Sequence, residues 1–236
     1  MKTAIVTGAS KGIGRVIALK LAALNYSLVI VGRNEKQLAE LKSEIEEKGV
    51  SCLILAVDLR EEKSPEFIIN EAVSHFGKID LLVSNAGIGH SAKIAETDIE
   101  FWNDIFQVNA RAPFFLCKAA VPFLKKSVNP IIIIIGSVVG FKGYAGQAAY
   151  SSSKHALAGF TKVLAKEVQD DGISVHLISP GGVNTEMVQE MRPDINAGEL
   201  IQPDEIAELI EFLVTRKGRG TIDHFYLRRK SGKAFD

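Results

Sequence analysis

Tyr150 and Lys154 are the two side chains of this sequence whose types and spacing best suit proton transfer. In a helix this separation is about one turn, so both side chains lie on the same face. An ammonium group beside a phenol favours the phenolate, which lowers the pKa of a tyrosine from its ordinary value of about 10. The pair therefore predicts a tyrosine that donates and accepts protons near neutral pH. The same spacing also occurs at exposed helix starts, so the other motifs of the chain must decide between the two interpretations.

The elements that must position this pair alternate between short apolar runs and longer amphipathic segments. Apolar runs without polar alternation are typical of strands that are covered on both faces. Strands are expected at residues 4–7, 28–31, 53–57, 81–84, 131–135 and 175–178. Helices are expected at residues 12–24, 35–48, 65–76, 99–126, 148–170 and 203–214. The alternation predicts a doubly wound parallel sheet with helices on both faces, a three-layer α/β/α sandwich that forms one domain over residues 1–236.

The turn after the first strand is rich in glycine. Gly8, Gly12 and Gly14 lie between this strand and the first helix. Glycines there allow a tight turn and close approach to a pyrophosphate, while the helix N-terminus supplies N–H groups and a positive dipole. The alternative is a strand-to-helix turn without a ligand. The position directly after the first strand favours a dinucleotide site.

The end of the second strand indicates which dinucleotide binds. An NAD site would place a carboxylate about 20 residues after the glycines to bind the ribose hydroxyls, but here Gly32 and Arg33 follow the strand. Arg33 can pair with a phosphate through two N–H groups, and Lys11 in the glycine-rich turn adds a second cation. Both cations can also be solvated surface residues. The missing acid and the two bases together favour NADP(H) over NAD(H) as the cofactor.

Polar or small residues also follow the later strands, at the edge where open α/β sheets bind ligands. They are Asp58, Leu59, Asn85, Ala86, Gly87, Ser137, Pro180 and Gly181. Asp58 can accept a hydrogen bond from an adenine amino group, or it can cap the next helix. Asn109 lies inside an expected helix, where it can be a polar residue of the exposed face; asparagine is a poor helix former, which favours some other role. Residues 186–200 follow the sixth strand and are a candidate lid.

Composition and charge exclude several classes of function. The chain has 236 residues, of which 47% are hydrophobic, and a formal net charge of zero. This composition suits a well-packed domain and argues against a protein that binds nucleic acid through its overall charge. No apolar run is long enough for a membrane span, and Cys52 and Cys117 lack the spacing of metal ligands. We expect a cytoplasmic protein with buried, reduced thiols, no metal, and neither nucleic acid nor membrane as a partner.

Five motifs occur in order, and together they resemble the short-chain dehydrogenase/reductase family over about residues 3–215. They are Thr7-Gly8-x-x-x-Gly12-Ile13-Gly14, Asn85-Ala86-Gly87, Ser137, Tyr150-x-x-x-Lys154 and Pro180-Gly181. Residues 137–140 and 146–150 look most like those of 3-oxoacyl-carrier-protein reductases, and sepiapterin-reductase-like proteins are also similar. The resemblance implies a Rossmann fold.

The resemblance also implies roles for individual residues. Tyr150 would give its proton to a carbonyl oxygen, and Lys154 would lower the tyrosine pKa and hold the nicotinamide ribose. Ser137 would hydrogen-bond the carbonyl oxygen, and Asn109 would position a water that relays protons to Lys154. The implied cofactor contacts are Gly8, Ser10, Lys11, Gly12, Ile13, Gly14, Arg33, Asp58, Leu59, Asn85, Ala86, Gly87, Tyr150, Lys154, Pro180, Gly181, Val183 and Thr185. Among these, Asp58 would bind the adenine, and Val183 and Thr185 the carboxamide.

The implied function is NADPH-dependent reduction of a ketone or 3-oxoacyl substrate to a secondary alcohol, by hydride transfer with Tyr150 as the proton donor. The partner would be a small carbonyl compound or an acyl thioester. One alternative is an NAD-dependent alcohol dehydrogenase of the same family. Another is a non-catalytic NADP-sensing protein, which would be expected to lack some of the four catalytic side chains, and all four are present.

The end of the chain departs from the family pattern. Residues 221–230 predict a last strand with a short polar tail, where many members have a glycine-rich tail that supports tetramers. A homodimer or homotetramer is expected. Residues 216–233 carry seven basic side chains and one acid, Asp223. We interpret them as a charged edge that discourages aggregation; the alternative is a docking patch for an acidic carrier protein or a phosphorylated substrate.

Overall fold

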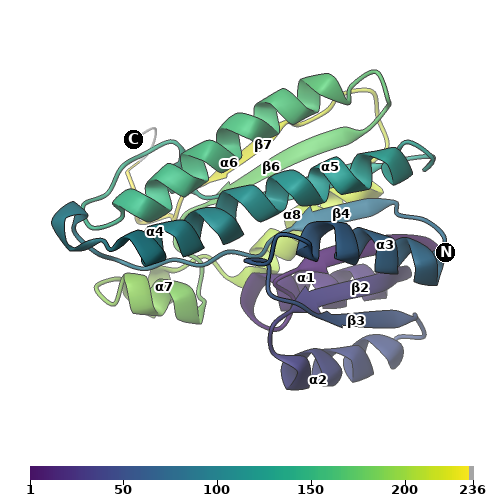
Figure 1. Ribbon diagram of the computed structural model, residues 1–236, viewed down its shortest axis with the longest axis horizontal. Helices are drawn as coiled ribbons and strands as arrows, with labels where there is room; N and C mark the ends of the chain where they lie inside the picture. Colours follow the sequence, from purple (N-terminus) through teal and green to yellow (C-terminus); the bar gives the residue numbers. More distant parts are fainter. Residues whose placement is uncertain (234–236) are drawn as a thin grey trace.

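The computed structural model describes residues 1–233. Its centre is a seven-stranded sheet in which all neighbouring strands are parallel, in the order β3-β2-β1-β4-β5-β6-β7 (Figure 1). The strands are β1 (Lys2–Thr7), β2 (Tyr26–Gly32), β3 (Cys52–Ala56), β4 (Leu81–Ser84), β5 (Ile131–Ile135), β6 (Ser174–Pro180) and β7 (His224–Leu227). The order reverses between β1 and β4, which is where such sheets open a ligand crevice at their carboxyl edge.

Helices cover both faces of the sheet, as expected (Figure 1). On one face the apolar core includes residues of α1 (Gly12–Ala23), α2 (Glu35–Glu46) and α8 (Pro203–Thr215). On the other face it includes residues of α3 (Ser64–Phe76), α5 (Ala112–Leu124) and α6 (Ala148–Glu167). The central strands carry an apolar side chain toward each face, because both faces are covered by helices. The prediction of a three-layer α/β/α Rossmann-type fold is confirmed.

The single helix expected over residues 99–126 is wrong. The structure divides it into α4 (Ile99–Phe106), a π-helical turn η2 (Gln107–Arg111) and α5. Pro113 stands in the first turn of α5. Proline has no N–H to donate to the carbonyl four residues earlier, so the regular hydrogen-bond ladder is interrupted here. The wider turn places Asn109 in the interior of the molecule, where it is fully buried.

The candidate lid contains two short helices that the sequence did not predict, α7 (Glu186–Met191) and η4 (Ala197–Glu199). Met191 and Leu200 are buried, so this segment is anchored to the body by two apolar side chains. The last strand, β7, is shorter than expected and pairs in parallel with β6 at the edge of the sheet. Its carboxyl end therefore reaches the same edge as the other strands.

Two expectations about the whole chain concern its thiols and its hydrophobic segments. Cys52 and Cys117 are buried and form no disulfide. Burial raises the pKa of both thiols to about 12, so neither is a reactive thiolate. None of the described helices combines the length and the apolar composition that a bilayer-spanning helix needs.

Candidate active site

A cleft of about 610 Å³ opens along the carboxyl edge of the sheet. It is lined by every residue that the sequence assigned to the site except Gly14 and Asn109. These lining residues are Gly8, Ser10, Lys11, Gly12, Ile13, Arg33, Asp58, Leu59, Asn85, Ala86, Gly87, Ser137, Tyr150, Lys154, Pro180, Gly181, Val183 and Thr185. Parallel strands bring them together because all the carboxyl ends lie on one side.

The glycine-rich turn is held in shape by hydrogen bonds from the neighbouring strand. Gly8 and Gly12 have φ values of 66° and 58°, which other residues adopt at a cost. The Asn85 amide donates to the carbonyl of Gly8 at 3.2 Å and to that of Thr7 at 2.9 Å. The Thr7 hydroxyl in turn accepts from the Asn85 backbone N–H at 3.0 Å. Asn85 and Thr7 therefore position the turn, and the sequence did not assign this task to either of them.

Gly14 shapes the turn from outside the cleft. A Cβ at Gly14 would lie 2.2 Å from the Gly8 carbonyl oxygen, which is a backbone atom that cannot move aside easily. The first turn of α1 contains no acidic residue, and no side chain caps its N–H groups. These N–H groups are available to an anion, as the N-terminus of a dinucleotide-binding helix requires. The turn and the cleft thus fit the pyrophosphate of a dinucleotide.

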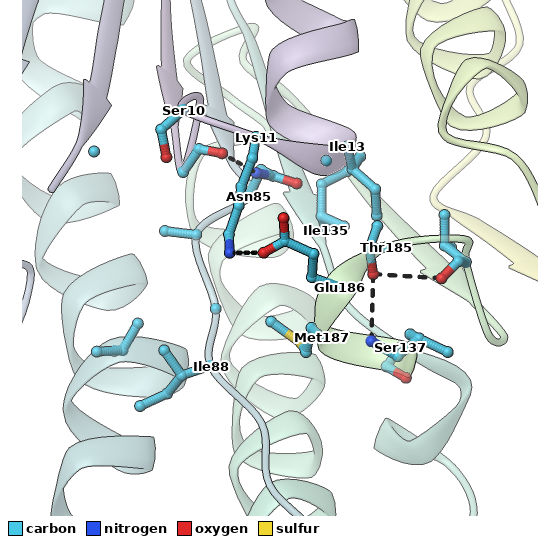
Figure 2. A pocket seen from close by; sticks show the side chains of 18 of the residues that line it. Ser10, Lys11, Ile13, Asn85, Ile88, Ile135, Ser137, Thr185, Glu186 and Met187 are labelled. Atoms are coloured by element: carbon cyan, nitrogen blue, oxygen red, sulfur yellow. Dashed lines mark hydrogen bonds and ion pairs between the residues drawn. The ribbon is translucent and has the colours of Figure 1, made fainter. Parts of the chain in front are cut away.

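The charged residues that line the cleft near the ends of β2 and β3 differ in their partners. Arg33 is exposed and forms no ion pair within residues 1–233. Lys11 instead pairs with Glu186 at the start of α7, so the ion pair links the two sides of the cleft (Figure 2). Asp58 pairs with Arg60 at 2.6 Å, which holds the pKa of the Asp58 carboxyl below its usual range.

Arg60 is a cleft residue that the sequence reading missed. It engages Asp58 through Nε and Nη2 and Asp104 of α4 through Nη1 at 2.8 Å. The carboxylate predicted to bind adenine is therefore already paired with a guanidinium group. No pattern in the sequence separated Arg60 from the other surface arginines.

Tyr150 and Lys154 lie one turn apart on α6, and both border the cleft. Lys154 is 5% exposed. Its Nζ donates to the Ile135 carbonyl oxygen at 3.2 Å and lies 5.8 Å from the centre of the Tyr150 ring. A Cβ at Gly87 would lie 3.6 Å from this nitrogen. The small residues after β4 thus leave room beside the ammonium group.

The pKa values of the pair differ from the sequence-based expectation. Burial raises the pKa of Tyr150, while a hydrogen bond with Ser137 lowers it by a smaller amount. Burial lowers the pKa of Lys154 to about 8. The net lowering of the tyrosine pKa that the pair predicted is not found in this structure, because the loss of hydration around the phenol is the largest effect.

Ser137 follows β5 and caps the short helix η3 (Val138–Gly140). Its Oγ accepts from the backbone N–H of Val139 at 3.3 Å and donates to the Pro180 carbonyl at 3.5 Å. Both hydrogen bonds are long, so a ligand oxygen can compete for this hydroxyl. Ser137 and Tyr150 also line a second cavity of about 190 Å³, which adjoins the cleft. The hydroxyl groups of serine and tyrosine therefore stand where two cavities meet.

Asn109 lies outside the cleft lining. Its Oδ1 accepts from the Ile88 N–H at 2.9 Å, and its Nδ2 donates to the Ile88 carbonyl at 2.8 Å and to Ser153 Oγ at 3.1 Å. Both amide hydrogens are thus used within the protein. In this structure Asn109 ties the loop after β4 to α6.

The described residues contain no group of three or more His, Cys, Asp or Glu side chains arranged to hold a metal ion. Near Ser137, Tyr150 and Lys154 the cleft offers hydroxyl groups and an ammonium group, and at its other end the guanidinium groups of Arg33 and Arg60. These groups suit hydrogen bonding to a coenzyme and to a carbonyl oxygen.

Comparison with known proteins relates the chain to reductases and dehydrogenases. The family described as short chain dehydrogenase matches residues 2–196. The 3-oxoacyl-[acyl-carrier-protein] reductase FabG of Escherichia coli is 36% identical over 222 residues, which are 91% of this chain and 90% of that protein. The protein of the same name from Staphylococcus aureus is 33% identical, with 92% of each chain covered.

Two solved structures share the fold over nearly the whole length. An alcohol dehydrogenase from the archaeon Thermococcus sibiricus, complexed with 5-hydroxy-NADP, superposes with a TM-score of 0.91 at 27% identity and covers 99% of both chains. A metagenomic short-chain oxidoreductase in complex with NADP has a TM-score of 0.85 at 30% identity and covers 97% of both chains. The chain therefore belongs to the short-chain dehydrogenase/reductase family and is an NAD(P)-dependent oxidoreductase that acts on CH–OH or C=O groups.

Proposed function

We propose that this chain catalyses the NADPH-dependent reduction of a ketone or 3-oxoacyl substrate to a secondary alcohol. The observation that carries the proposal is the position of Ser137 and Tyr150, whose side chains border both the cleft and the second cavity. A coenzyme in the cleft and a substrate in the second cavity would meet beside these two hydroxyl groups. Lys154 borders the cleft only, on the coenzyme side.

Each side chain has a task that follows from its surroundings. The nicotinamide coenzyme, when bound, supplies the hydride that reduces the carbonyl carbon. Ser137 donates a hydrogen bond to the carbonyl oxygen and holds it near Tyr150. Since burial raises the pKa of Tyr150, its hydroxyl keeps its proton at neutral pH and donates it to the oxygen as negative charge develops there. Lys154, with a pKa of about 8, is largely protonated at pH 7, and its ammonium group stabilises the phenolate that remains.

The preference for NADPH is supported by Arg33. This exposed guanidinium group borders the adenosine end of the cleft and has no carboxylate partner among residues 1–233. The end of β2 carries no Asp or Glu, although an NAD site would be expected to place a carboxylate there. Lys11 is a weaker candidate for the phosphate than the sequence predicted, because Glu186 already neutralises it.

The reaction is tested by replacing Tyr150 with phenylalanine. We expect kcat for NADPH-dependent ketone reduction to fall by about 10²–10⁴-fold, the usual contribution of a general acid, while the Kd for NADPH changes little. Tyr26→Phe is the matched control, because Tyr26 is buried in β2 away from the cleft. Near-normal turnover in the Tyr150→Phe protein would remove the proposal.

The coenzyme preference is tested by replacing Arg33 with alanine. We expect the ratio of kcat/KM for NADPH to that for NADH to fall at least tenfold, which corresponds to about 1.4 kcal/mol and is within reach of one charge-assisted hydrogen bond. Lys36→Ala provides the control, since Lys36 is an exposed cation on the neighbouring helix α2. An unchanged ratio in the Arg33→Ala protein would show that another group selects the coenzyme.

A further inference from the structure

Among residues 1–233, several basic side chains and no acidic one line the second cavity. Its cations are Lys142, Arg192, Arg228, Arg229 and Lys233. Ser137 and Tyr150 are among the residues that line both this cavity and the coenzyme cleft. We propose that the cavity binds an anionic group of the substrate, so that the substrate is a small ketone carrying a carboxylate or a phosphate. This inference rests on the proposed function, and it names the substrate class of that site.

The end of β7 brings two of these cations into the lining of the cavity that Ser137 and Tyr150 also border. The Gly181 N–H donates to the Leu227 carbonyl at 2.7 Å, so the chain after β7 runs along the loop that follows β6. A Cβ at Gly181 would lie 3.6 Å from the Arg229 backbone nitrogen, and one at Gly182 would lie 3.7 Å from Arg229 Cδ. Arg228 and Arg229 are therefore packed against a loop that borders both cavities.

The charges of the cavity are only partly compensated. Arg192 pairs with Asp194 at 2.7 Å, and Arg229 pairs with Glu199 at 3.3 Å. Arg228 has no carboxylate partner within residues 1–233; its Nη1 instead donates to three backbone carbonyls of its own tail, the nearest at 2.8 Å. Lys233 likewise forms no ion pair with another described residue. Uncompensated positive charge therefore remains in the lining of the cavity that Tyr150 also borders.

The dimensions of the cavity favour a small acid over a long acyl chain. Its volume of about 190 Å³ is below the roughly 300–1,000 Å³ of common ligand pockets. The Arg229 side chain is 23% exposed, so its interaction with an anion is less screened than that of a surface charge. Guanidinium groups match carboxylate and phosphate oxygens with two parallel hydrogen bonds, which also orients the ligand.

The cavity divides the basic segment near the end of the chain into two parts. Arg228, Arg229 and Lys233 line the cavity, whereas Arg216, Lys217, Arg219 and Lys230 do not. For the four cations outside the cavity we keep the interpretation that the basic segment is a charged edge that discourages aggregation. They also supply a matched control, since Arg219 is an exposed arginine of the same segment.

The test compares matched substrates that differ in charge. The kcat/KM of the full chain with NADPH is measured for acetoacetate, 4-oxopentanoate and 5-oxohexanoate against their ethyl esters, and for dihydroxyacetone phosphate against dihydroxyacetone. We expect at least one anion to exceed its neutral partner tenfold or more. The comparison of carboxylates with the phosphate shows which anion the site prefers. The three keto acids show which separation between the ketone and the carboxylate it prefers.

Variants connect that preference to the cavity. Arg228→Ala and Arg229→Ala are expected to raise KM for the preferred anion at least tenfold, with a much smaller change in kcat, because they remove binding rather than proton transfer. Arg229→Lys, which keeps the charge, should recover part of the loss. Arg219→Ala should leave all rates unchanged. A preference for the anion that survives both alanine variants would overturn the assignment to this cavity.

A binding measurement separates this inference from the proposed reaction. Calorimetric titration of the Tyr150→Phe protein with 4-oxopentanoate in the presence of NADP⁺ should give heat of binding, and titration with its ethyl ester should give none. Neutral ketones reduced as well as the anions would overturn the anion site and leave the reductase intact. So would a preference for acetoacetyl-acyl-carrier protein over every free acid. Anion binding without turnover of any ketone would instead uphold the site and overturn the reductase.

Discussion

Replacing Asn109 with alanine tests whether this side chain mainly supports the site or takes part in the reaction. The substitution removes three hydrogen bonds from a fully buried position, two of them to the backbone of Ile88 and one to Ser153. A hydrogen bond contributes about 1 kcal/mol net to stability, and more where a buried group is left without a partner. We therefore expect the free energy of unfolding to fall by about 3 kcal/mol, a large part of the ~5–15 kcal/mol of a typical domain.

Urea denaturation followed by circular dichroism measures this loss directly. The midpoint of thermal unfolding should fall by about 6–12 °C, since 1 kcal/mol shifts Tm by about 2–4 °C in a domain of this size. Asn103→Ala is the control, because Asn103 lies exposed on α4 and its side chain has no hydrogen-bond partner within residues 1–233. That variant should stay within about 0.5 kcal/mol of the parent.

One result would refute the reasoning about Asn109. If the Asn109→Ala protein unfolded at the same urea concentration as the parent and lost only kcat, the three hydrogen bonds would contribute nothing to stability. The side chain would then act in the reaction, as the family resemblance implied when it assigned Asn109 to a proton-relaying water.

Two further substitutions test the cleft and its ammonium group. Gly14→Ala should lower the free energy of unfolding by more than about 2 kcal/mol and weaken NADPH binding, because its Cβ would meet the Gly8 carbonyl at 2.2 Å. Gly159→Ala is the control: a Cβ there has no atom within 4 Å, so the free energy of unfolding should rise by up to about 1 kcal/mol. Equal urea midpoints for the two proteins would contradict this prediction. Lys154 has a folded pKa of about 8, below its ordinary 10.5, so the folded state binds the proton more weakly than the unfolded state does. Its charge therefore costs stability below pH 8, and the cost disappears as the pH rises toward 10.5. The Lys154→Met protein should be about 2 kcal/mol more stable than the parent at pH 7, after allowance for the lost hydrogen bond to Ile135. This difference in the free energy of unfolding should become smaller by pH 10. A difference independent of pH would contradict the lowered pKa of Lys154.

The alternation of elements was predictable because it depends on local periodicity. A run such as Ile131–Ile135 is apolar at every position, which only a strand covered on both faces explains well at this length. Helix ends were less certain, and α2 and α6 each end a few residues before the expected point. The division of the helix over residues 99–126 was not predicted, although Pro113 was a visible signal for it.

The identity of the cleft residues was also predictable, because parallel strands deliver their carboxyl ends to one edge. The ion pairs that some of these residues form within the protein were not predictable. Asp58 and Arg60 are two residues apart, and their pairing depends on the conformation of the loop after β3. Lys11 and Glu186 are far apart in the sequence and meet only in the folded chain. The pKa of Tyr150 depended in the same way on burial, which the spacing to Lys154 does not reveal.

By itself the sequence determined the layers of the fold, the glycine-rich turn and the set of side chains able to handle a coenzyme and a proton. These features follow from periodicity and from short motifs whose members are close along the chain. Only the tertiary structure decided that Arg228 and Arg229 line the same cavity as Tyr150. They come together because β7 pairs with β6 and brings the last described residues to the loop after Pro180, a contact between distant parts of the chain that no local pattern encodes.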